Sequence, residues 1–167
     1  RLGRRLYEVP VGFKWVSAKM SETGAIIGGE SSGGMAVRGH ISGKDGIYAA
    51  ALLVEMLAVT GKSVSELFAE ITAQYGNPCW AEADFRMTPE RKAELQKLLF
   101  TEKRVPEFGT AVDHISLEDG CKVYFKDGSW VICRFSGTEP LLRMAAEGES
   151  QSQARTYIRI WREALGL

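Results

Sequence analysis

Two Asp-Gly dipeptides in the second half of the sequence place the strongest constraint on its fold. They separate short runs rich in β-branched and aromatic residues, at 111–117, 122–126 and 130–135. Asp-Gly between such runs favours a tight hairpin, because both residues tolerate the positive φ angles that hairpin turns need. Further strand-like runs lie at 80–87 and 141–147. The sequence therefore predicts an antiparallel sheet made largely of consecutive strands.

Two helices are expected to accompany these strands. Thr88-Pro89-Glu90 is a typical helix start, with threonine as the N-cap and proline at the first position. A second helix is predicted after Ser150, because apolar residues follow at helical spacing. Its core-facing residues are Ala154, Tyr157, Ile158, Trp161 and Leu165. The second half is thus predicted to be a small α+β domain with two helices on one face of the sheet.

The first half has a different pattern and reads as part of an α/β domain. Helices are predicted at 12–20 and 46–59 and a short strand at 25–27. Asp45 is a plausible N-cap for the second of these helices and Gly61 its C-terminal glycine. Ser63 and Glu66 have capping-box spacing and open a third helix. Gly76-Asn77-Pro78 then breaks the chain, which predicts domains at 1–76 and 77–167.

Composition limits the classes of partner. Lysine plus arginine and aspartate plus glutamate both number 21, so the chain has no overall attraction for nucleic acid or anionic membrane. Three scattered cysteines show no metal-binding or disulfide spacing and fit a reducing cytosol. The apolar run 47–59 is interrupted by Glu55 and is too short to span a bilayer. A cytoplasmic protein is expected, and the starting arginine indicates a piece of a longer chain.

The run 134–140, Arg-Phe-Ser-Gly-Thr-Glu-Pro, concentrates groups that bind phosphate. A guanidinium can contact two phosphate oxygens at once. Two hydroxyls flank a glycine, whose missing side chain lets backbone N–H groups approach an anion. The predicted phosphate ligands are Arg134, Ser136, Gly137 and Thr138, with Arg143 on the next strand as a further candidate.

A second polar, glycine-rich run, Gly-Gly-Glu-Ser-Ser-Gly-Gly at 28–34, lies about a hundred residues upstream. It offers the carboxylate of Glu30 and the hydroxyl of Ser32, groups that suit sugar hydroxyls better than phosphate. The two runs together indicate a phosphosugar ligand.

In their order and separation these motifs resemble the α-D-phosphohexomutase superfamily, which includes phosphoglucomutase, phosphomannomutase and phosphoglucosamine mutase. Enzymes of this family have four domains. Val11-Gly12-Phe13-Lys14, the run 28–34, His40-Ile41 and Lys44-Asp45-Gly46 resemble the end of the third domain, and 134–140 resembles the phosphate loop of the fourth. The resemblance covers nearly the whole chain but only the C-terminal portion of the family.

The chain departs from the family pattern at two positions. Ser31 stands where the sugar loop commonly has a second glutamate, and Phe135 stands where the phosphate loop commonly has proline. Replacing proline removes a fixed φ angle. Neither change removes the atoms expected to contact a ligand.

The resemblance implies an isomerase that transfers phosphate within the molecule, interconverting hexose 1-phosphate and hexose 6-phosphate through a hexose 1,6-bisphosphate. The family's phosphoserine and Mg²⁺ loops belong to the first two domains, so this chain alone is expected to be inactive and to hold no metal. The resemblance assigns the distal phosphate to Arg134, Ser136, Gly137 and Thr138, the ring hydroxyls to Glu30 and Ser32, and a place near the bound phosphosugar to Lys14.

Other polar residues have both functional and structural interpretations. His40 is a candidate proton shuttle by its titration range, and a structural hydrogen-bonding role fits equally well. Lys44 and Asp45 are expected to serve the helix start and a local ion pair. Glu139 is expected to pair with Arg143 or to shape the loop rather than touch a ligand.

The leading hypothesis is therefore the substrate-binding C-terminal portion of a phosphoglucomutase or phosphomannomutase. Its expected partners are a hexose phosphate and the N-terminal domains of the same protein, with no nucleic acid or membrane. Phosphoglucosamine mutase is the alternative within the class, disfavoured only by the Ser-Gly-Gly ending of the sugar loop at 32–34. A non-catalytic phosphosugar- or anion-binding module is the alternative from a different class.

Overall fold

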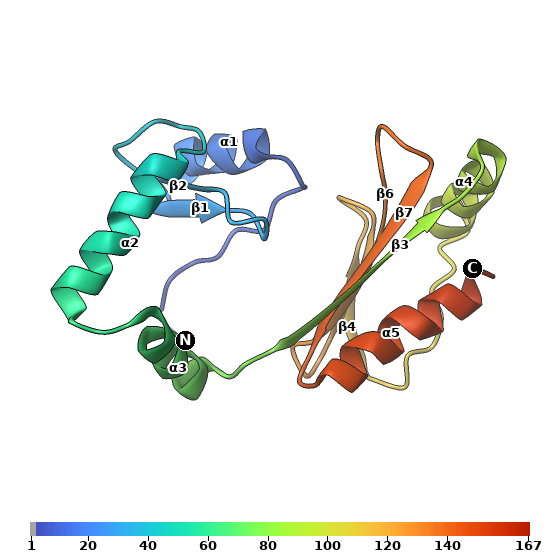
Figure 1. The fold of residues 1–167 in the computed structure, drawn as a ribbon. Helices are drawn as coiled ribbons and strands as arrows, with labels where there is room; N and C mark the ends of the chain where they lie inside the picture. Colours follow the sequence, from blue (N-terminus) through green and yellow to red (C-terminus); the bar gives the residue numbers. More distant parts are fainter. Residues whose placement is uncertain (1–2) are drawn as a thin grey trace. The chain divides into compact units, whose positions relative to one another are not determined.

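The structure, a computed structural model, describes residues 3–167. The chain divides into two compact units, one ending at Gln74 and the other running from Tyr75 to Leu167 (Figure 1). Each unit has its own fold, and the residues with phosphate-binding and sugar-binding chemistry fall in different units.

The first unit combines helices with a two-stranded antiparallel sheet. In chain order its elements are α1 (Phe13–Thr23), β1 (Ile27–Gly29), β2 (Met35–Val37), α2 (Gly46–Thr60) and α3 (Val64–Tyr75). The hairpin of β1 and β2 lies beside α1, and Val16 and Ala36 are the buried apolar residues of this small core. The loop that joins β1 to β2 contains Glu30.

The strand expected at 25–27 is displaced along the chain, because β1 spans Ile27–Gly29. Gly28 explains the shift. A Cβ at this position would lie 2.5 Å from Cγ1 of Val16 and 2.6 Å from Sδ of Met20. Only a residue without a side chain lets the strand approach α1 this closely. The prediction from the β-branched residues was therefore wrong in position, since packing against the helix outweighed local propensity.

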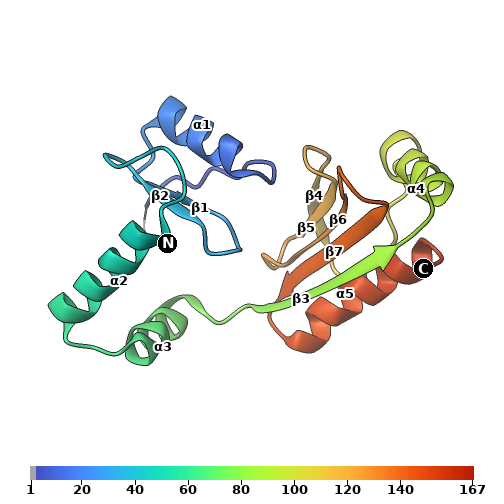
Figure 2. The same cartoon turned by 45° about the horizontal axis from the view of Figure 1, so that its top comes forward.

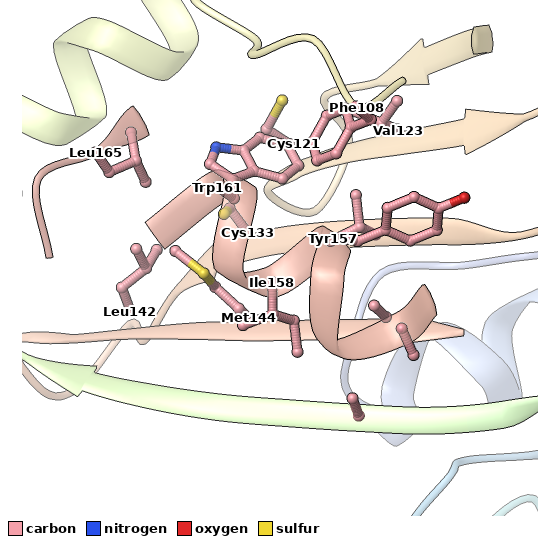
Figure 3. Close-up of a cluster of buried hydrophobic side chains, with 14 of the residues drawn as sticks. Phe108, Cys121, Val123, Cys133, Leu142, Met144, Tyr157, Ile158, Trp161 and Leu165 are labelled. Carbon is pink, nitrogen blue, oxygen red and sulfur yellow. The ribbon is translucent and has the colours of Figure 1, made fainter. Parts of the chain in front are cut away.

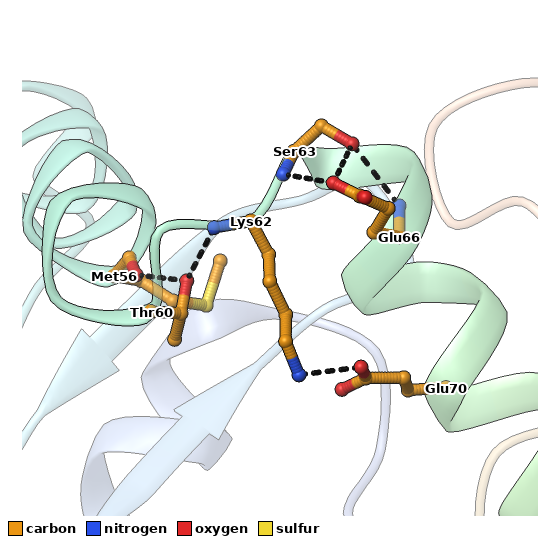
Figure 4. A network of polar contacts seen from close by, with 6 residues as sticks. All are labelled: Met56, Thr60, Lys62, Ser63, Glu66 and Glu70. Atoms are coloured by element: carbon orange, nitrogen blue, oxygen red, sulfur yellow. Dashed lines mark hydrogen bonds and ion pairs between the residues drawn. The ribbon is translucent and has the colours of Figure 1, made fainter.

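Both predicted ends of α2 and the predicted start of α3 are confirmed. The Asp45 carboxylate accepts hydrogen bonds from the backbone N–H groups of Ile47 and Tyr48, both at 3.0 Å. Gly61 ends α2 in a left-handed conformation, with φ of 66°. The Ser63–Glu66 capping box is complete, since the Ser63 N–H donates to Glu66 at 2.8 Å and the Glu66 N–H donates to Ser63 Oγ at 3.3 Å (Figure 4).

Apolar side chains of α2 and α3 are largely exposed in this unit, including Ile47, Val54, Val59 and Phe68. In the described part of the chain, no single helix is both long and apolar enough to cross a membrane. Taken together, α2 and α3 reach the required length and apolar character, but they meet at a bend of 83°.

The second unit is built on a five-stranded antiparallel sheet in the order β3-β7-β6-β5-β4 (Figure 2). The strands are β3 (Cys79–Arg86), β4 (Val112–Ser116), β5 (Cys121–Phe125), β6 (Trp130–Phe135) and β7 (Leu141–Gly148). Both predicted Asp-Gly hairpins are present, joining β4 to β5 and β5 to β6. The strands β3 and β7, which come first and last along the chain in this unit, pair along their whole length.

Both predicted helices of this unit form and are capped as expected. Helix α4 (Pro89–Gln96) begins after Thr88, whose Oγ1 accepts from the Arg91 N–H at 3.3 Å, and it continues into a π-helical turn at Lys97–Thr101. Helix α5 (Gln151–Ala164) begins after Ser150, whose Oγ accepts from the Gln153 N–H at 3.1 Å. Their apolar residues join one core on a single face of the sheet, which confirms the α+β prediction.

The core of the second unit lies between this face and α5 (Figure 3). Trp161 is fully buried and its ring packs edge-on against Phe108, with centroids 5.4 Å apart. The predicted core role of the α5 aromatics is thus confirmed. The sheet contributes the side chains that alternate inward, namely Cys121, Val123, Val131, Cys133, Leu142 and Met144. The intervening residues, among them Arg134 and Arg143, lie on the opposite face.

Burial disfavours the reactive thiolate form of two of the three cysteines. It raises the pKa of the Cys121 thiol to about 11 and, together with the neighbouring Cys121, raises that of Cys133 well above its usual value. Cys79 is only half-buried. At pH 8 we expect iodoacetamide to modify Cys121 and Cys133 at least about 100-fold more slowly than Cys79, because the thiolate is the reactive form. Peptide mapping by mass spectrometry measures these rates; equal rates for the three in folded protein would contradict the burial.

Candidate functional site

The phosphate-loop candidate connects β6 to β7 and is closed at its base. The Ser136 N–H donates to the Leu141 carbonyl at 2.8 Å. The Ser136 hydroxyl is buried beneath the loop, where its oxygen accepts from the backbone N–H groups of Thr138 and Glu139, at 3.4 and 3.3 Å. It also lies 3.5 Å from Thr138 Oγ1, a contact in which either hydroxyl can donate. Ser136 therefore organises the turn, while Gly137, Thr138 and Glu139 are exposed above it.

Neither the backbone conformation nor the described surroundings of Gly137 require a glycine at this position. Its φ is not positive, and a Cβ built on it would meet no atom within 4 Å. Gly120 makes the contrast clear, because its φ is 98° and a Cβ there would lie 2.5 Å from the Cys133 carbonyl oxygen. The missing side chain at Gly137 leaves the loop backbone open to whatever approaches from solvent.

Lys92, on α4, holds the loop from below and was missed by the sequence analysis. Its Nζ donates to the Ser136 carbonyl at 2.7 Å and lies 3.3 Å from the Glu139 carbonyl. Lys92 thus contacts backbone carbonyls at both ends of the turn. A lysine in an amphipathic helix gives no sequence signal for a contact 44 residues away. Glu139 shapes the loop through its backbone, which is one of the two roles expected for it.

Arg134 and Arg143 face each other at the base of this loop. They are directly paired in the register of β6 and β7, on the sheet face opposite α5. Like charges in this position destabilise a sheet unless an anion or a carboxylate compensates them. Asp119 approaches one edge of Arg134, with Oδ2 4.0 Å from Nε, and Asp84 on β3 is the cross-strand partner of Arg143 on its other side. The pair therefore supplies two guanidinium groups beside an open backbone turn.

The sugar-loop candidate is the tight connection between β1 and β2. The Glu30 N–H donates to the Gly34 carbonyl at 2.9 Å, and the Gly33 N–H donates to the Glu30 carbonyl at 3.0 Å. Gly33 has a φ of 91°, a conformation that glycine adopts without strain. Ser31 and Ser32 lie at the exposed tip of this connection, and the Glu30 side chain is largely covered, with 20% of it exposed.

Lys44 contacts the Glu30 carboxylate across the mouth of this loop, with Nζ 3.2 Å from Oε2. Lys44 thus forms an ion pair, but its partner is 14 residues away in the sequence and not the local one expected. The expected helix-start role falls to Asp45. The Glu30 carboxylate is therefore fixed by a cation from the segment that leads into α2.

His40 and Lys14 occupy different surroundings. His40 Nε2 lies 2.8 Å from Asp45 Oδ2, and its ring stacks on Tyr48 with centroids 4.0 Å apart. The hydrogen bond with His40, followed by those from the Tyr48 and Ile47 N–H groups, holds the pKa of Asp45 below its usual value. His40 thus braces the N-terminus of α2. Lys14 lies exposed in the first turn of α1, with Nζ 4.7 Å from the centroid of the Trp15 ring.

No group of three or more histidine, cysteine, aspartate or glutamate side chains within 3–167 is arranged to hold a metal ion. The described residues offer groups suited to anion binding in the second unit and to hydrogen bonding with hydroxyl groups in the first.

Protein-family models match both units of the chain. The model described as phosphoglucomutase/phosphomannomutase, alpha/beta/alpha domain III, matches residues 1–75. The model described as phosphoglucomutase/phosphomannomutase, C-terminal domain, matches residues 83–162. The chain belongs to the phosphoglucomutase/phosphomannomutase family.

Individual relatives agree with this assignment. The chain is 33% identical over 162 residues to a phosphoglucomutase/phosphomannomutase of Thermococcus kodakarensis, covering 96% of this chain and 33% of that one. It is 29% identical over 159 residues to a phosphoglucosamine mutase of Salinispora arenicola, covering 93% of this chain and 30% of that one. A crystal structure of a family protein from Burkholderia thailandensis aligns with a TM-score of 0.67 at 25% identity, covering 93% and 31%. The chain spans about a third of the length of these relatives.

Proposed function

We propose that this chain is the substrate-binding C-terminal portion of a longer enzyme that interconverts hexose 1-phosphate and hexose 6-phosphate, acting on glucose or mannose phosphates. The observation that carries the proposal is the cross-strand pairing of Arg134 with Arg143 beside an open glycine turn. A carboxylate lies next to each arginine, Asp119 beside Arg134 and Asp84 across from Arg143, so the support for a phosphate is the fork geometry of the two guanidinium groups beside an exposed turn.

The phosphate would be held by groups of three kinds. The guanidinium groups of Arg134 and Arg143 supply charge and paired N–H donors. The Ser136 and Thr138 hydroxyls donate hydrogen bonds. The bare backbone at Gly137 allows a phosphate oxygen to approach the turn closely. Lys92 contributes indirectly, because it keeps the loop carbonyls turned away from the anion.

The sugar would be held by the loop of the first unit. Glu30 accepts hydrogen bonds from ring hydroxyls, and Ser32 at the exposed tip can donate or accept. Contacts of this kind are shared by two opposite poses of a hexose. An enzyme that adds phosphate at one end and removes it from the other needs such contacts, because the sugar must turn over between the two steps. Positioning of this kind supplies much of the catalysis of phosphoryl transfer.

The phosphoryl-transferring serine and the Mg²⁺ ion of the family would belong to the preceding domains of the longer protein. Mg²⁺ would neutralise charge on the transferring phosphoryl group there. The residues of this chain bind and orient the hexose phosphate. His40, braced by Asp45 and Tyr48, remains a candidate proton shuttle in this proposal, and Lys14 a candidate contact to the phosphosugar.

The proposal is tested with the full-length protein in the presence of Mg²⁺ and a hexose 1,6-bisphosphate activator. Glucose 1-phosphate and mannose 1-phosphate are supplied separately, and ³¹P NMR follows the formation of the 6-phosphates. We expect turnover of at least one of them, and none by residues 1–167 alone. Binding of a hexose phosphate without turnover by the full-length protein would favour a non-catalytic phosphosugar-binding module. Turnover by the shorter chain would refute its assignment as a binding portion.

A further inference from the structure

The contact between Lys44 and Glu30 is built into the fold of the first unit. Lys44 directly precedes Asp45, the N-cap of α2, so its backbone is fixed by the capping bonds to Ile47 and Tyr48. Glu30 lies at the base of the β1–β2 connection, fixed by its backbone bonds to Gly33 and Gly34. Two separately fixed backbones therefore bring the ammonium and carboxylate groups within 3.2 Å.

Gly34 clears the path of the lysine side chain. A Cβ at Gly34 would overlap Cδ of Lys44 and lie 3.0 Å from its Cγ and 3.5 Å from Oε2 of Glu30. The φ angle of Gly34 is not in the left-handed region, so its backbone does not itself require glycine. The lysine stem lies flat across this residue, and Nζ lies 5.4 Å from the centroid of the Phe13 ring. The placement of Lys44 thus depends on the missing side chain at Gly34.

We propose that Lys44 is a specificity-determining residue that makes the sugar loop select neutral hexose phosphates over 2-aminohexose phosphates. This inference rests on the proposed function, in which Glu30 binds ring hydroxyls. Lys44 donates a hydrogen bond to Oε2 of Glu30, and Oε1 can still accept a hydrogen bond from a sugar hydroxyl. The site then presents a neutralised ion pair, which suits an uncharged hydroxyl.

A protonated amine on the sugar would interact with both the Glu30 carboxylate and the Lys44 ammonium group in this site. A lone glutamate would attract it, whereas the Lys44 ammonium cancels that attraction and repels the second cation. Discrimination by an added repulsive group is a general route to specificity. Because the Lys44 side chain is 52% exposed, solvent screens the effect and the expected factor is modest.

The test compares glucose 1-phosphate with glucosamine 1-phosphate in the full-length protein and its Lys44→Met variant, which keeps the stem and removes the charge. We expect the ratio of kcat/KM for glucosamine 1-phosphate to that for glucose 1-phosphate to rise by up to about fivefold, the factor for like charges roughly 4 Å apart in bulk water. Lys44→Arg should restore the wild-type ratio. Gly34→Ala, which displaces the lysine, should shift the ratio in the same direction as Lys44→Met.

A pH series separates charge repulsion from a structural effect. In the wild-type protein the ratio should rise as the substrate amine loses its proton, near pH 8 if its pKa is like that of an α-amino group. The rise should be smaller in Lys44→Met. Lys62→Met removes another lysine–glutamate pair of the same unit, with Glu70, and should leave the ratio unchanged (Figure 4).

The outcomes distinguish the two proposals. An unchanged ratio in a folded Lys44→Met variant that still converts glucose 1-phosphate would overturn the specificity role and leave the mutase assignment standing. A wild-type protein that converts no hexose phosphate would overturn both. Circular dichroism of each variant shows whether the fold is retained.

Discussion

Replacement of Arg134 by alanine is expected to lower kcat/KM of the full-length protein for glucose or mannose 1-phosphate by about 10- to 100-fold. Arg134 lies near the end of β6, paired in register with Arg143, and its Nε lies 4.0 Å from Asp119 Oδ2. Charge-assisted hydrogen bonds to such a group are worth about 1.5–3 kcal/mol, which converts to this range of rates. Steady-state kinetics with the hexose 1-phosphate as varied substrate measures the loss.

Arg155 provides a matched control for this experiment. It is an exposed arginine on α5 in the same unit, so Arg155→Ala changes the net charge equally without touching the loop. Arg143→Ala should also reduce kcat/KM, and the double variant should lose less than the product of the two single effects, because both groups would bind one anion. If Arg134→Ala matches the Arg155→Ala control, the phosphate-binding role assigned to this residue is wrong.

Replacement of Trp161 by alanine is expected to cost the second unit about 3–5 kcal/mol of unfolding free energy, the usual range for a large aromatic side chain removed from a core. Trp161 is fully buried on α5 and contacts Phe108 (Figure 3). Native-state hydrogen exchange of the β6 and β7 backbone amides reports the stability of this unit within the full-length protein.

Trp161→Phe is the informative control. The indole Nε1 of Trp161 has no hydrogen-bond partner among residues 3–167 and is buried. Phenylalanine removes this unpaired donor while keeping an aromatic ring, so its cost should be clearly smaller than that of alanine. Equal exchange rates in Trp161→Ala and the wild-type protein would show that α5 does not hold the sheet together.

Local signals in the sequence account for much of the fold. The Asp-Gly turns, the caps at Asp45, Thr88 and Ser150, and the apolar spacing of α5 each depend on residues only a few positions apart, and each is confirmed. The position of β1 was missed because its cause is not local. Gly28 packs against α1, and nothing within a strand-sized window reveals this contact.

In the candidate site, too, local features could be predicted from the sequence and long-range contacts could not. The loops themselves could be recognised from their residue types, since phosphate and sugar chemistry need particular groups at close spacing. The supporting contacts could not, because Lys92 reaches the loop across 44 residues and Lys44 reaches Glu30 across 14. The opposition of Arg134 and Arg143 also depends on the hairpin register, which the turn between β6 and β7 sets only once the loop is folded.

The contact of Lys92 on α4 with the loop between β6 and β7 couples the position of the loop to that of the helix. Because one ammonium group joins the carbonyls of Ser136 and Glu139, a displacement of the helix carries the whole turn with it. Under the proposed function, substrate affinity would therefore depend on buried residues beneath the turn, such as Leu95 of α4 and Leu99 of the π-helical turn that follows it. Variation in KM among natural homologues should accordingly follow changes beneath the turn as well as changes in it.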